Sequence, residues 1–335
     1  MKETLRFAII GCGLVSENYI DALDNVEGAK LVAVSDNNAS RLAKLSQAQG
    51  VDGYADYHQL LCRTDIDVVL VLTASGSHAE IGIDAANAGK HVIVEKPIDV
   101  TLEAAQNLVD CCRENNVILG SIFQKRFEPA VIALKEAVHT GQLGRINSCC
   151  CHTKWYRDQD YYDCAPWRGT LKLDGGGALI NQGIHYIDLM LQVMGAAEEV
   201  YGYVRTLAHE RIEGEDVAVA VIKFHSGAIG MIESTTSAYP GFYTRLDVHG
   251  NEGTIMLEND LIKSWELKSK STCDKSLMST GIEVRHRLQM KDIINSIRNG
   301  YTPEVSGEEA IKALKVVLAI YESNRTGLPV KLTDG

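Results

Sequence analysis

The stretch LRFAIIGCGLVSEN, residues 5–18, predicts a buried strand that turns on two glycines into a helix. We expect the strand over residues 5–11 and the helix to about Val26. The turn follows the dinucleotide fingerprint G-x-G-x-x-G, except that Ser16 stands at the third glycine. Serine is small enough for close helix–strand packing, and the amides at the helix start suit a cofactor pyrophosphate. The stretch therefore predicts the first strand, turn and helix of a Rossmann domain.

The same alternation of strand and helix continues to about residue 124. Strands are predicted at 31–36, 67–73, 91–94 and 117–123, and helices at 38–49, 78–89 and from Thr101 to about Asn115. Ser77 and Glu80 have the spacing of a capping box at the start of one helix. This alternation is typical of a doubly wound parallel sheet, so residues 1–124 are expected to form an NAD-binding Rossmann domain.

The pattern changes in residues 125–335. We expect helices at 129–139, 177–194, 285–299 and 307–323, a strand at 146–156, and successive strands from Val200 to Trp265. Short turns such as Pro240-Gly241 separate these strands and favour antiparallel pairing. The prediction is a C-terminal α/β domain for substrate binding and oligomerisation, with a large open, mostly antiparallel sheet. Its last helices can pack back on the first domain, and residues 268–280 are expected to be mobile.

Composition limits the partners of this 335-residue chain. The formal net charge of −11 argues against nucleic-acid and anionic-membrane partners, which require basic patches. No signal peptide and no run long enough for a membrane span is visible. The nine cysteines show no C-x-x-C spacing, so free thiols in the reducing cytoplasm are expected and no metal site is predicted.

Candidate cofactor contacts lie where strands of the first half end. Asp36 closes the second strand, where a carboxylate can bind the ribose hydroxyls of the cofactor and repel a 2′-phosphate. This favours NAD over NADP. The corner from Thr73 to His78 is a second candidate contact, although it can equally serve to cap the next helix.

Two further motifs carry chemistry. Glu95-Lys96-Pro97 ends the buried strand at 91–94. A lysine at such a position is expected either to point into solvent or to serve a function. The proline there suggests a cis Lys96-Pro97 bond. In the second half, Gly175-Gly176-Gly177 leads into a helix on which Asn181, His185 and Asp188 share one face. A lone helical histidine is more often structural, but this polar face after a glycine-rich entry favours a cleft.

In this order and spacing, the glycine turn, Glu95-Lys96-Pro97 and the Gly175–Asp188 segment resemble the Gfo/Idh/MocA oxidoreductases, named for glucose–fructose oxidoreductase and inositol dehydrogenase. The resemblance implies NAD(P)-dependent chemistry on CH–OH groups of a carbohydrate, with Lys96 as active-site lysine and His185 as its partner. Many members carry an aspartate where Asn181 stands here. An amide cannot act as a base, so the proton is expected to go to His185 or Lys96.

The resemblance also implies a wider set of contacts. Cofactor contacts are expected from Gly11, Gly13, Leu14, Val15, Asp36, Thr73, Ser75, His78, Glu95, Lys96, Gln124, Trp167 and Arg168. Substrate contacts are expected from Lys96, Trp155, Tyr156, Arg157, Asn181, Gln182 and His185. The open sheet of the second domain implies a homodimer or a homotetramer.

Within the family, the segments Tyr161-Tyr162, Trp167–Thr170 and Asn181-Gln182 resemble the branch that oxidises UDP-N-acetylglucosaminuronic acid at the 3-position. The aromatic and basic residues nearby can stack on a sugar and bind an anion, or they can form an aromatic cluster at a domain interface. The basic residues that gather here in the sequence are Lys154, Arg157, Arg168 and Lys172.

Three other activities stay open: an inositol or polyol dehydrogenase, a glycosidase that uses NAD transiently, and a non-catalytic NAD-binding regulator. The presence of both Lys96 and His185 argues against the regulator. Release of a sugar without net NADH would indicate the glycosidase.

Overall fold

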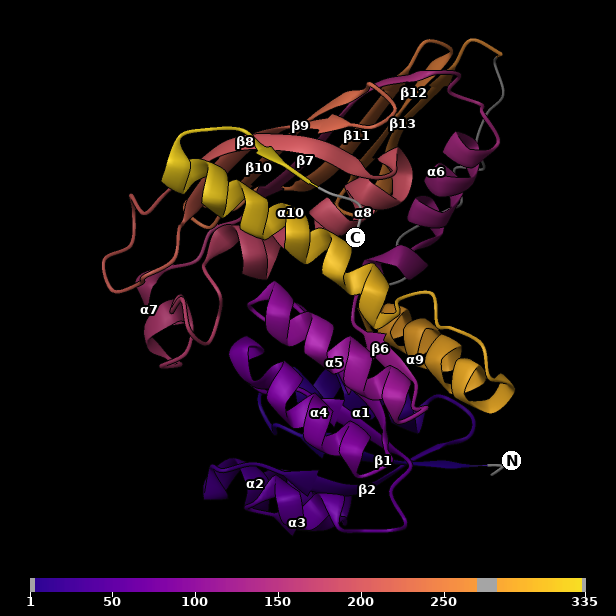
Figure 1. Cartoon of the computed structure of the whole chain (residues 1–335), viewed down its shortest axis with the longest axis vertical. Coiled ribbons are helices and arrows are strands. Elements are labelled where there is room, and N and C mark those ends of the chain that lie inside the picture. The colour runs from indigo at the N-terminus through magenta and orange to yellow at the C-terminus, as the bar shows by residue number, and fades with distance from the viewer. Residues whose placement is uncertain (1–3, 270–281, 333–335) are drawn as a thin grey trace. The chain divides into compact units, whose positions relative to one another are not determined.

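The computed structural model describes residues 4–269 and 282–332. The chain divides into two compact units (Figure 1). The first comprises Met1–Gln124 and Gly281–Ile311, and the second comprises Lys125–Thr280 and Lys312–Gly335. Most of the segment for which mobility is expected, 268–280, lies outside the described residues.

The first unit contains a six-stranded parallel sheet. Its strands are β1 (Leu5–Ile10), β2 (Ala29–Ser35), β3 (Asp52–Tyr54), β4 (Val68–Val71), β5 (His91–Val94) and β6 (Leu119–Ser121). They are ordered β3-β2-β1-β4-β5-β6, and every pair is parallel. This is the order of a Rossmann sheet, with its topological switch point between β1 and β4. The fold prediction for this part is confirmed. The sequence did not reveal β3, because its residues Asp-Gly-Tyr include two types that strands disfavour.

Helices cover this sheet. They are α1 (Ser16–Asp24), α2 (Ala39–Gln49), α3 (Tyr57–Leu61), α4 (His78–Asn87), α5 (Leu102–Glu114) and α9 (Ile282–Asn299), with short turns η1 (Ser75–Ser77) and η2 (Gln124–Phe127). Helix α1 packs beside α9, and α4 packs beside α5 (Figure 1). Every residue of β4 is buried, as expected of a parallel strand covered on both faces.

Two predicted helix caps had different outcomes. The Thr101 side chain accepts the Ala104 amide at 3.2 Å and caps α5, as predicted. The capping box at α4 was wrong. The Ser77 hydroxyl donates to the Ala74 carbonyl at 2.7 Å, because the chain enters α4 through the tight turn η1.

The second unit contains an eight-stranded sheet in the order β13-β12-β11-β7-β10-β9-β8-β14. Its strands are β7 (Ile146–Lys154), β8 (Ala197–Arg205), β9 (Val217–Phe224), β10 (Ile229–Thr235), β11 (Thr244–Gly250), β12 (Gly253–Glu258), β13 (Leu261–Leu267) and β14 (Val330–Lys331). All pairs are antiparallel except β7 with β10, so the predicted mostly antiparallel sheet is confirmed.

One face of this sheet forms the core of the second unit. Along β9, Ala218, Ala220, Ile222 and Phe224 are buried, while the alternate residues face outward. The helices of this unit are α6 (Pro129–His139), α7 (Gln159–Asp163), α8 (Ile184–Met194) and most of α10 (Gly307–Thr326), which begins in the first unit. Helix α8 packs against β7 and β11 (Figure 1).

The helix predicted over residues 177–194 has two parts. It starts as a π-helical segment, η3 (Ala178–Gly183), and continues as α8. Asn181 lies in the first part and His185 in the second. A π-helix is rare and often occurs at functional sites.

Candidate active site

The glycine turn after β1 is shaped by close contact on one side and open space on the other. Gly11 has φ +105°, and a Cβ there would lie 2.5 Å from the Leu72 carbonyl oxygen. A Cβ on Gly13 would meet no atom of the described residues within 4 Å. Leu14 is 81% exposed, and no side chain caps the start of α1. The turn at Gly13 and Leu14 is therefore open beside the start of α1, where a pyrophosphate would fit.

Asp36 ties the glycine turn to the end of β2. Its carboxylate accepts the Cys12 amide at 2.8 Å and the Asn38 amide at 2.7 Å. Arg41 donates to the same carboxylate, with its Nε at 3.2 Å and its Nη2 at 3.0 Å. Burial opposes ionisation, but these hydrogen bonds lower the pKa of Asp36 overall. The carboxylate is thus held charged beside the turn.

The corner between β4 and α4 holds Thr73, Ser75 and His78. The Thr73 and Ser77 hydroxyls lie 2.8 Å apart, and Ser75 is buried. The His78 ring is also buried, with Nδ1 2.8 Å from the Pro97 carbonyl and Nε2 3.2 Å from the Thr73 carbonyl. Both ring nitrogens therefore face main-chain oxygens. In this arrangement His78 joins the corner to the turn that carries Lys96.

Lys96 leaves the end of β5 from a fixed main chain. The Lys96-Pro97 bond is cis, as predicted. The Glu95 carboxylate accepts the Lys96 amide at 2.7 Å and the Tyr19 hydroxyl of α1 at 2.5 Å. One carboxylate thus connects the turn bearing the lysine to the helix that follows the glycine turn.

Gln124 follows the end of β6 and offers a further polar atom. Its Oε1 is buried and has no hydrogen-bond partner within the described ranges. Buried acceptors rarely stay without a donor. The open glycine turn, the charged Asp36 and this acceptor together make the first unit fit a dinucleotide.

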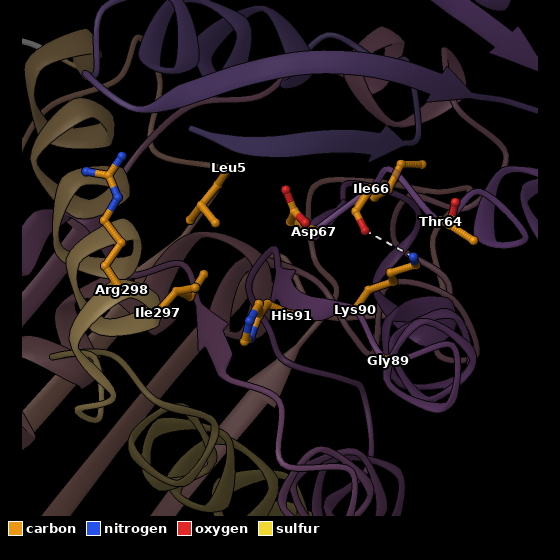
Figure 2. A pocket seen from close by; sticks show the side chains of 9 residues that line it. All are labelled: Leu5, Thr64, Ile66, Asp67, Gly89, Lys90, His91, Ile297 and Arg298. Carbon is orange, nitrogen blue, oxygen red and sulfur yellow. Dashed lines mark hydrogen bonds between the residues drawn. The ribbon is translucent and has the colours of Figure 1, made fainter. Parts of the chain in front are cut away.

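A pocket of about 340 Å³ lies elsewhere in the first unit (Figure 2). Its lining comprises Leu5, Thr64, Ile66, Asp67, Gly89, Lys90, His91, Ile297 and Arg298. These residues gather at the starts of β1, β4 and β5, whereas cofactors of doubly wound sheets bind at the carboxyl ends. The Lys90 ammonium donates to the Arg63 carbonyl at 2.7 Å and to the Ile66 carbonyl at 3.0 Å. We assign this lysine to holding the loop before β4.

In the second unit, Asp174 joins two segments that the sequence analysis singled out. This buried carboxylate accepts the Gly169 amide at 2.8 Å and the Asn181 side-chain amide at 2.6 Å. Gln182 donates to the Tyr161 hydroxyl at 3.0 Å. Asn181, Gln182 and the loop containing Arg168 are therefore connected in one polar network.

His185 and Asp188 have different surroundings, although both lie on α8. His185 is 8% exposed. Asp188 is 1% exposed and receives two hydrogen bonds from the Arg126 guanidinium, at 2.8 and 2.5 Å. The expectation that Asp188 faces a cleft was wrong, because the ion pair with Arg126 buries it.

Two arginines share the ring of Tyr161. The Arg157 guanidinium lies 5.1 Å from the ring centroid, and that of Arg168 lies 4.4 Å from it. Arg157 also lies over Trp155 at 5.3 Å, and Arg168 over Trp167 at 5.7 Å. The stacking orients both cations.

Neither of these guanidinium groups forms an ion pair with a carboxylate of the described residues. Their donors reach main-chain carbonyls, and Arg168 also reaches the Cys164 sulfur. The Nε of each is buried and has no acceptor within the described ranges. Lys154, expected in the same basic cluster, is instead neutralised by Glu233 at 2.9 Å. Two uncompensated cations in a protein of net charge −11 favour an anionic ligand.

Comparisons with known proteins agree with this geometry. Residues 5–123 match the profile of an oxidoreductase family with an NAD-binding Rossmann fold, and residues 131–256 match the GFO/IDH/MocA C-terminal domain. The myo-inositol 2-dehydrogenase of Thermotoga maritima is 30% identical over 339 residues, which cover 98% of this chain and 99% of that protein. The chain belongs to the GFO/IDH/MocA oxidoreductase family. It is an NAD-dependent oxidoreductase, and the NAD prediction is confirmed.

Solved structures show how closely this GFO/IDH/MocA chain follows known members. The WlbA dehydrogenase from Bordetella pertussis, in complex with NADH and UDP-GlcNAcA, superposes with a TM-score of 0.91 at 33% identity, covering 99% of this chain and 100% of that chain. The WlbA dehydrogenase from Chromobacterium violaceum, with the same two ligands, gives 0.93 at 32% identity and covers 99% and 97%. The resemblance to this branch is therefore confirmed.

Sequence reasoning missed several residues of the GFO/IDH/MocA site. Arg41, Tyr19 and Asp174 were not singled out, yet each binds a residue that was. Arg41 could have been suspected, because an arginine just beyond the second strand lies near the ribose position of a dinucleotide. Tyr19 and Asp174 gave no such signal, because their partners are set by tertiary contacts.

The described residues, 4–269 and 282–332, contain neither a membrane-spanning helix nor a metal-binding cluster. No helix there is long and apolar enough to cross a membrane. No group of three or more metal-binding side chains there is arranged to hold a metal ion.

Proposed function

We propose that the chain oxidises a secondary alcohol of an anionic sugar, a uronate carried on a nucleotide. The observation that supports this most strongly is the pair of arginines, Arg157 and Arg168, which aromatic rings orient and which pair with no carboxylate of the described residues. Two solved relatives at 32% and 33% identity were crystallised with UDP-GlcNAcA. Arginine suits such a ligand, because its planar fork binds carboxylate and phosphate in a bidentate manner.

In this proposal the catalytic residues are Lys96 and His185. NAD supplies the hydride acceptor. The Lys96 ammonium stabilises negative charge that develops on the reacting oxygen, and His185 accepts the hydroxyl proton. Asn181 and Gln182 hold substrate hydroxyl groups by hydrogen bonds, and Trp155 and Tyr156 offer rings for stacking.

The remaining cofactor assignments follow the geometry of the first unit. We propose that Gly11, Gly13, Leu14 and Val15 face the pyrophosphate, Asp36 the ribose, and Gln124 the carboxamide of the nicotinamide. Thr73 and Ser75 stay predicted cofactor contacts, as do Glu95 and Trp167 from the wider set. Arg168 was predicted as a cofactor contact, and this proposal assigns it to the anionic substrate instead. For His78 we propose instead that it holds the Lys96-Pro97 turn, because its ring nitrogens face the Pro97 and Thr73 carbonyls.

A direct substrate comparison tests this function. NADH formation would be followed by fluorescence with UDP-GlcNAcA, free uronates and myo-inositol as substrates. The inositol relative at 30% identity makes a neutral polyol the second candidate. A higher kcat/KM for UDP-GlcNAcA supports the proposal, and a much higher value for myo-inositol contradicts it. Sugar release without net NADH would indicate a glycosidase, and no turnover of any sugar would indicate a regulator.

Arg157→Ala should raise KM for the anionic substrate by about tenfold to hundredfold and leave kcat within twofold. A remote charged anchor contributes mainly uniform binding, and a hydrogen bond to a charged group carries an energy of that order. Steady-state kinetics check this, with NAD affinity measured by calorimetry and expected to be unchanged. Arg325→Ala is the matched control, because Arg325 is exposed and pairs with Glu322 on α10. An unchanged KM in Arg157→Ala would contradict the anchor.

Asp36→Ala should narrow the preference for NAD over NADP. The substitution removes a carboxylate that would repel a 2′-phosphate, and it releases the neighbouring Arg41 to bind that phosphate. Titration of both cofactors with the unmodified protein and the variant measures the change. Tighter binding of NADP by the unmodified protein would show that Asp36 does not select the cofactor.

We also propose that the outer face of the second unit's sheet is covered by a second copy of the chain. Tyr203, Val219, Val221 and Ile229 are exposed there, on three adjacent strands. Contiguous exposed apolar side chains usually mark an interface, and a closed dimer or tetramer would bury them. Light scattering should give a mass of two or four chains at micromolar concentration, and Val221→Glu should reduce it. A monomeric mass for the unmodified protein would contradict this.

A cytoplasmic location stays part of the proposal. The eight cysteines among the described residues are free thiols. Free thiols persist in a reducing compartment.

A further inference from the structure

Glu215 accepts hydrogen bonds from the main-chain amides at the start of η3. The Gly177 amide donates to Oε2 of Glu215 at 3.0 Å, and the Leu179 amide donates to Oε1 at 2.6 Å. Between them, the Ala178 amide donates to the main-chain carbonyl of Glu215 at 2.8 Å. The Tyr321 hydroxyl of α10 also donates to Oε1, at 3.1 Å. The first amides of a helix have no partner within it, and here a distant carboxyl group supplies one.

The glycines around this contact allow the close approach. A Cβ on Gly177 would lie 2.0 Å from the Glu215 carbonyl oxygen, and one on Gly214 would lie 2.2 Å from the carbonyl carbon of Gly176. Gly176 has φ +152°, and its Cβ would lie 2.2 Å from the Tyr321 hydroxyl. The glycine-rich entry is therefore built to fit Glu215 and Tyr321. This accounts for a motif that the cofactor and substrate assignments leave unexplained.

We propose that Glu215 is the positioning residue for the helix that carries Asn181 and His185. Its carboxyl group fixes the amides of Gly177 and Leu179, and the helix runs without a break from η3 into α8. The orientation of His185 then depends on a group that does not touch it. This inference rests on the proposed function, because it assigns a role to the presentation of His185.

The charge of Glu215 is set by its surroundings. Burial raises its pKa from 4.5 to about 7, and the hydrogen bonds from Leu179, Tyr321 and Gly177 oppose that shift. The other ionisable groups that act here are Tyr321 and Tyr162, whose own pKa values are raised, and Asp174. No basic nitrogen of the described residues lies within ion-pair distance of Glu215. Near neutral pH the Glu215 side chain therefore exchanges between the carboxylate and the protonated acid.

These two forms hold the helix differently. The carboxylate can accept all three donors, whereas the protonated acid carries a hydrogen on one oxygen and loses acceptor capacity there. The carboxylate therefore holds the helix start better than the acid does, but it makes the folded protein less stable. Because the folded pKa lies above that of the unfolded chain, the free energy of unfolding falls as pH rises from 4.5 to about 7. Glu215 thus binds the helix start best in the form that is costlier to bury.

The test compares Glu215→Gln with Ser323→Ala in the full chain. Glutamine keeps the size of the side chain but replaces one carboxylate oxygen with an N–H₂ group. The main-chain amide of either Gly177 or Leu179 then meets a donor in place of an acceptor. Ser323 is the matched control, because it is buried on α10 near Tyr321 in sequence and accepts the Gly202 amide at 3.1 Å, away from η3. Both variants lose a buried hydrogen bond, so both are expected to unfold at a lower temperature.

Four readouts distinguish the role of Glu215 from a general effect on stability. Hydrogen exchange of residues 176–183 should become about tenfold to hundredfold faster in Glu215→Gln and stay unchanged in Ser323→Ala. The NMR titration of the His185 ring should shift in the glutamine variant alone. With substrate, kcat should fall about tenfold or more while KM stays within twofold, because the loss affects the chemical step. The decline in stability between pH 4.5 and 7 should flatten in Glu215→Gln.

The outcomes also distinguish this inference from the proposed function. Exchange and the His185 titration need no substrate, so they test positioning even if no sugar is oxidised. Unchanged exchange in Glu215→Gln overturns the inference, as does equal loss of protection in Ser323→Ala. Faster exchange with an unchanged His185 titration and unchanged kcat also overturns it, because the helix start would then not affect the histidine.

Discussion

Lys96→Met is expected to lower kcat by about 10²- to 10³-fold and to leave NAD affinity within twofold. The reason is that the substitution removes the ammonium that stabilises developing charge on the reacting oxygen, and such groups carry effects of this size. Methionine keeps the unbranched shape of the side chain and lacks only its terminal, charged atom. The main chain is held independently, through the Lys96 amide on Glu95, so the turn should keep its shape.

Rapid-mixing kinetics with saturating substrate would measure this loss, and calorimetry would measure NAD binding. Lys90→Met is the matched control, because Lys90 is a buried lysine of the same unit that holds the Arg63 and Ile66 carbonyls. It should lower the melting temperature and keep kcat. Near-normal turnover in Lys96→Met would remove this lysine from the mechanism.

His185→Gln is the second variant with a large expected effect, a loss of about 10²- to 10⁴-fold in kcat. General acid–base catalysis by a placed histidine contributes a factor of that size. Glutamine can hydrogen-bond to a hydroxyl but cannot take its proton. Asn181, four residues before His185, cannot substitute as a base for the same reason.

The pH dependence of the rate should distinguish loss of a base from loss of structure. In the unmodified protein, kcat/KM should fall at acidic pH as His185 becomes protonated, and this decline should be weaker in the glutamine variant. His249→Gln is the matched control, because His249 lies on β11 and contacts the Thr254 hydroxyl. If His185→Gln kept both the rate and the pH profile, Lys96 alone would have to move the proton.

Much of this protein was determined by local sequence. The strand, glycine turn and helix at residues 5–18 predict the Rossmann domain, because a buried parallel strand is continuously apolar and only glycine adopts the turn at Gly11. The positions of Asp36 and Lys96 follow from the same logic. Each ends a parallel strand, and all such ends lie at one edge of the sheet.

The tertiary structure alone decided how these residues are held. Asp188 has the same spacing pattern as a cleft residue, yet Arg126, 62 residues away, makes it half of a buried ion pair. Glu215 lies 36 to 38 residues from the amides that it binds, and Arg41 changes the surroundings of Asp36 through its side chain. Such contacts leave no periodic trace in the sequence. They depend on which elements the completed fold brings together, and burial then fixes the charge and orientation of each group.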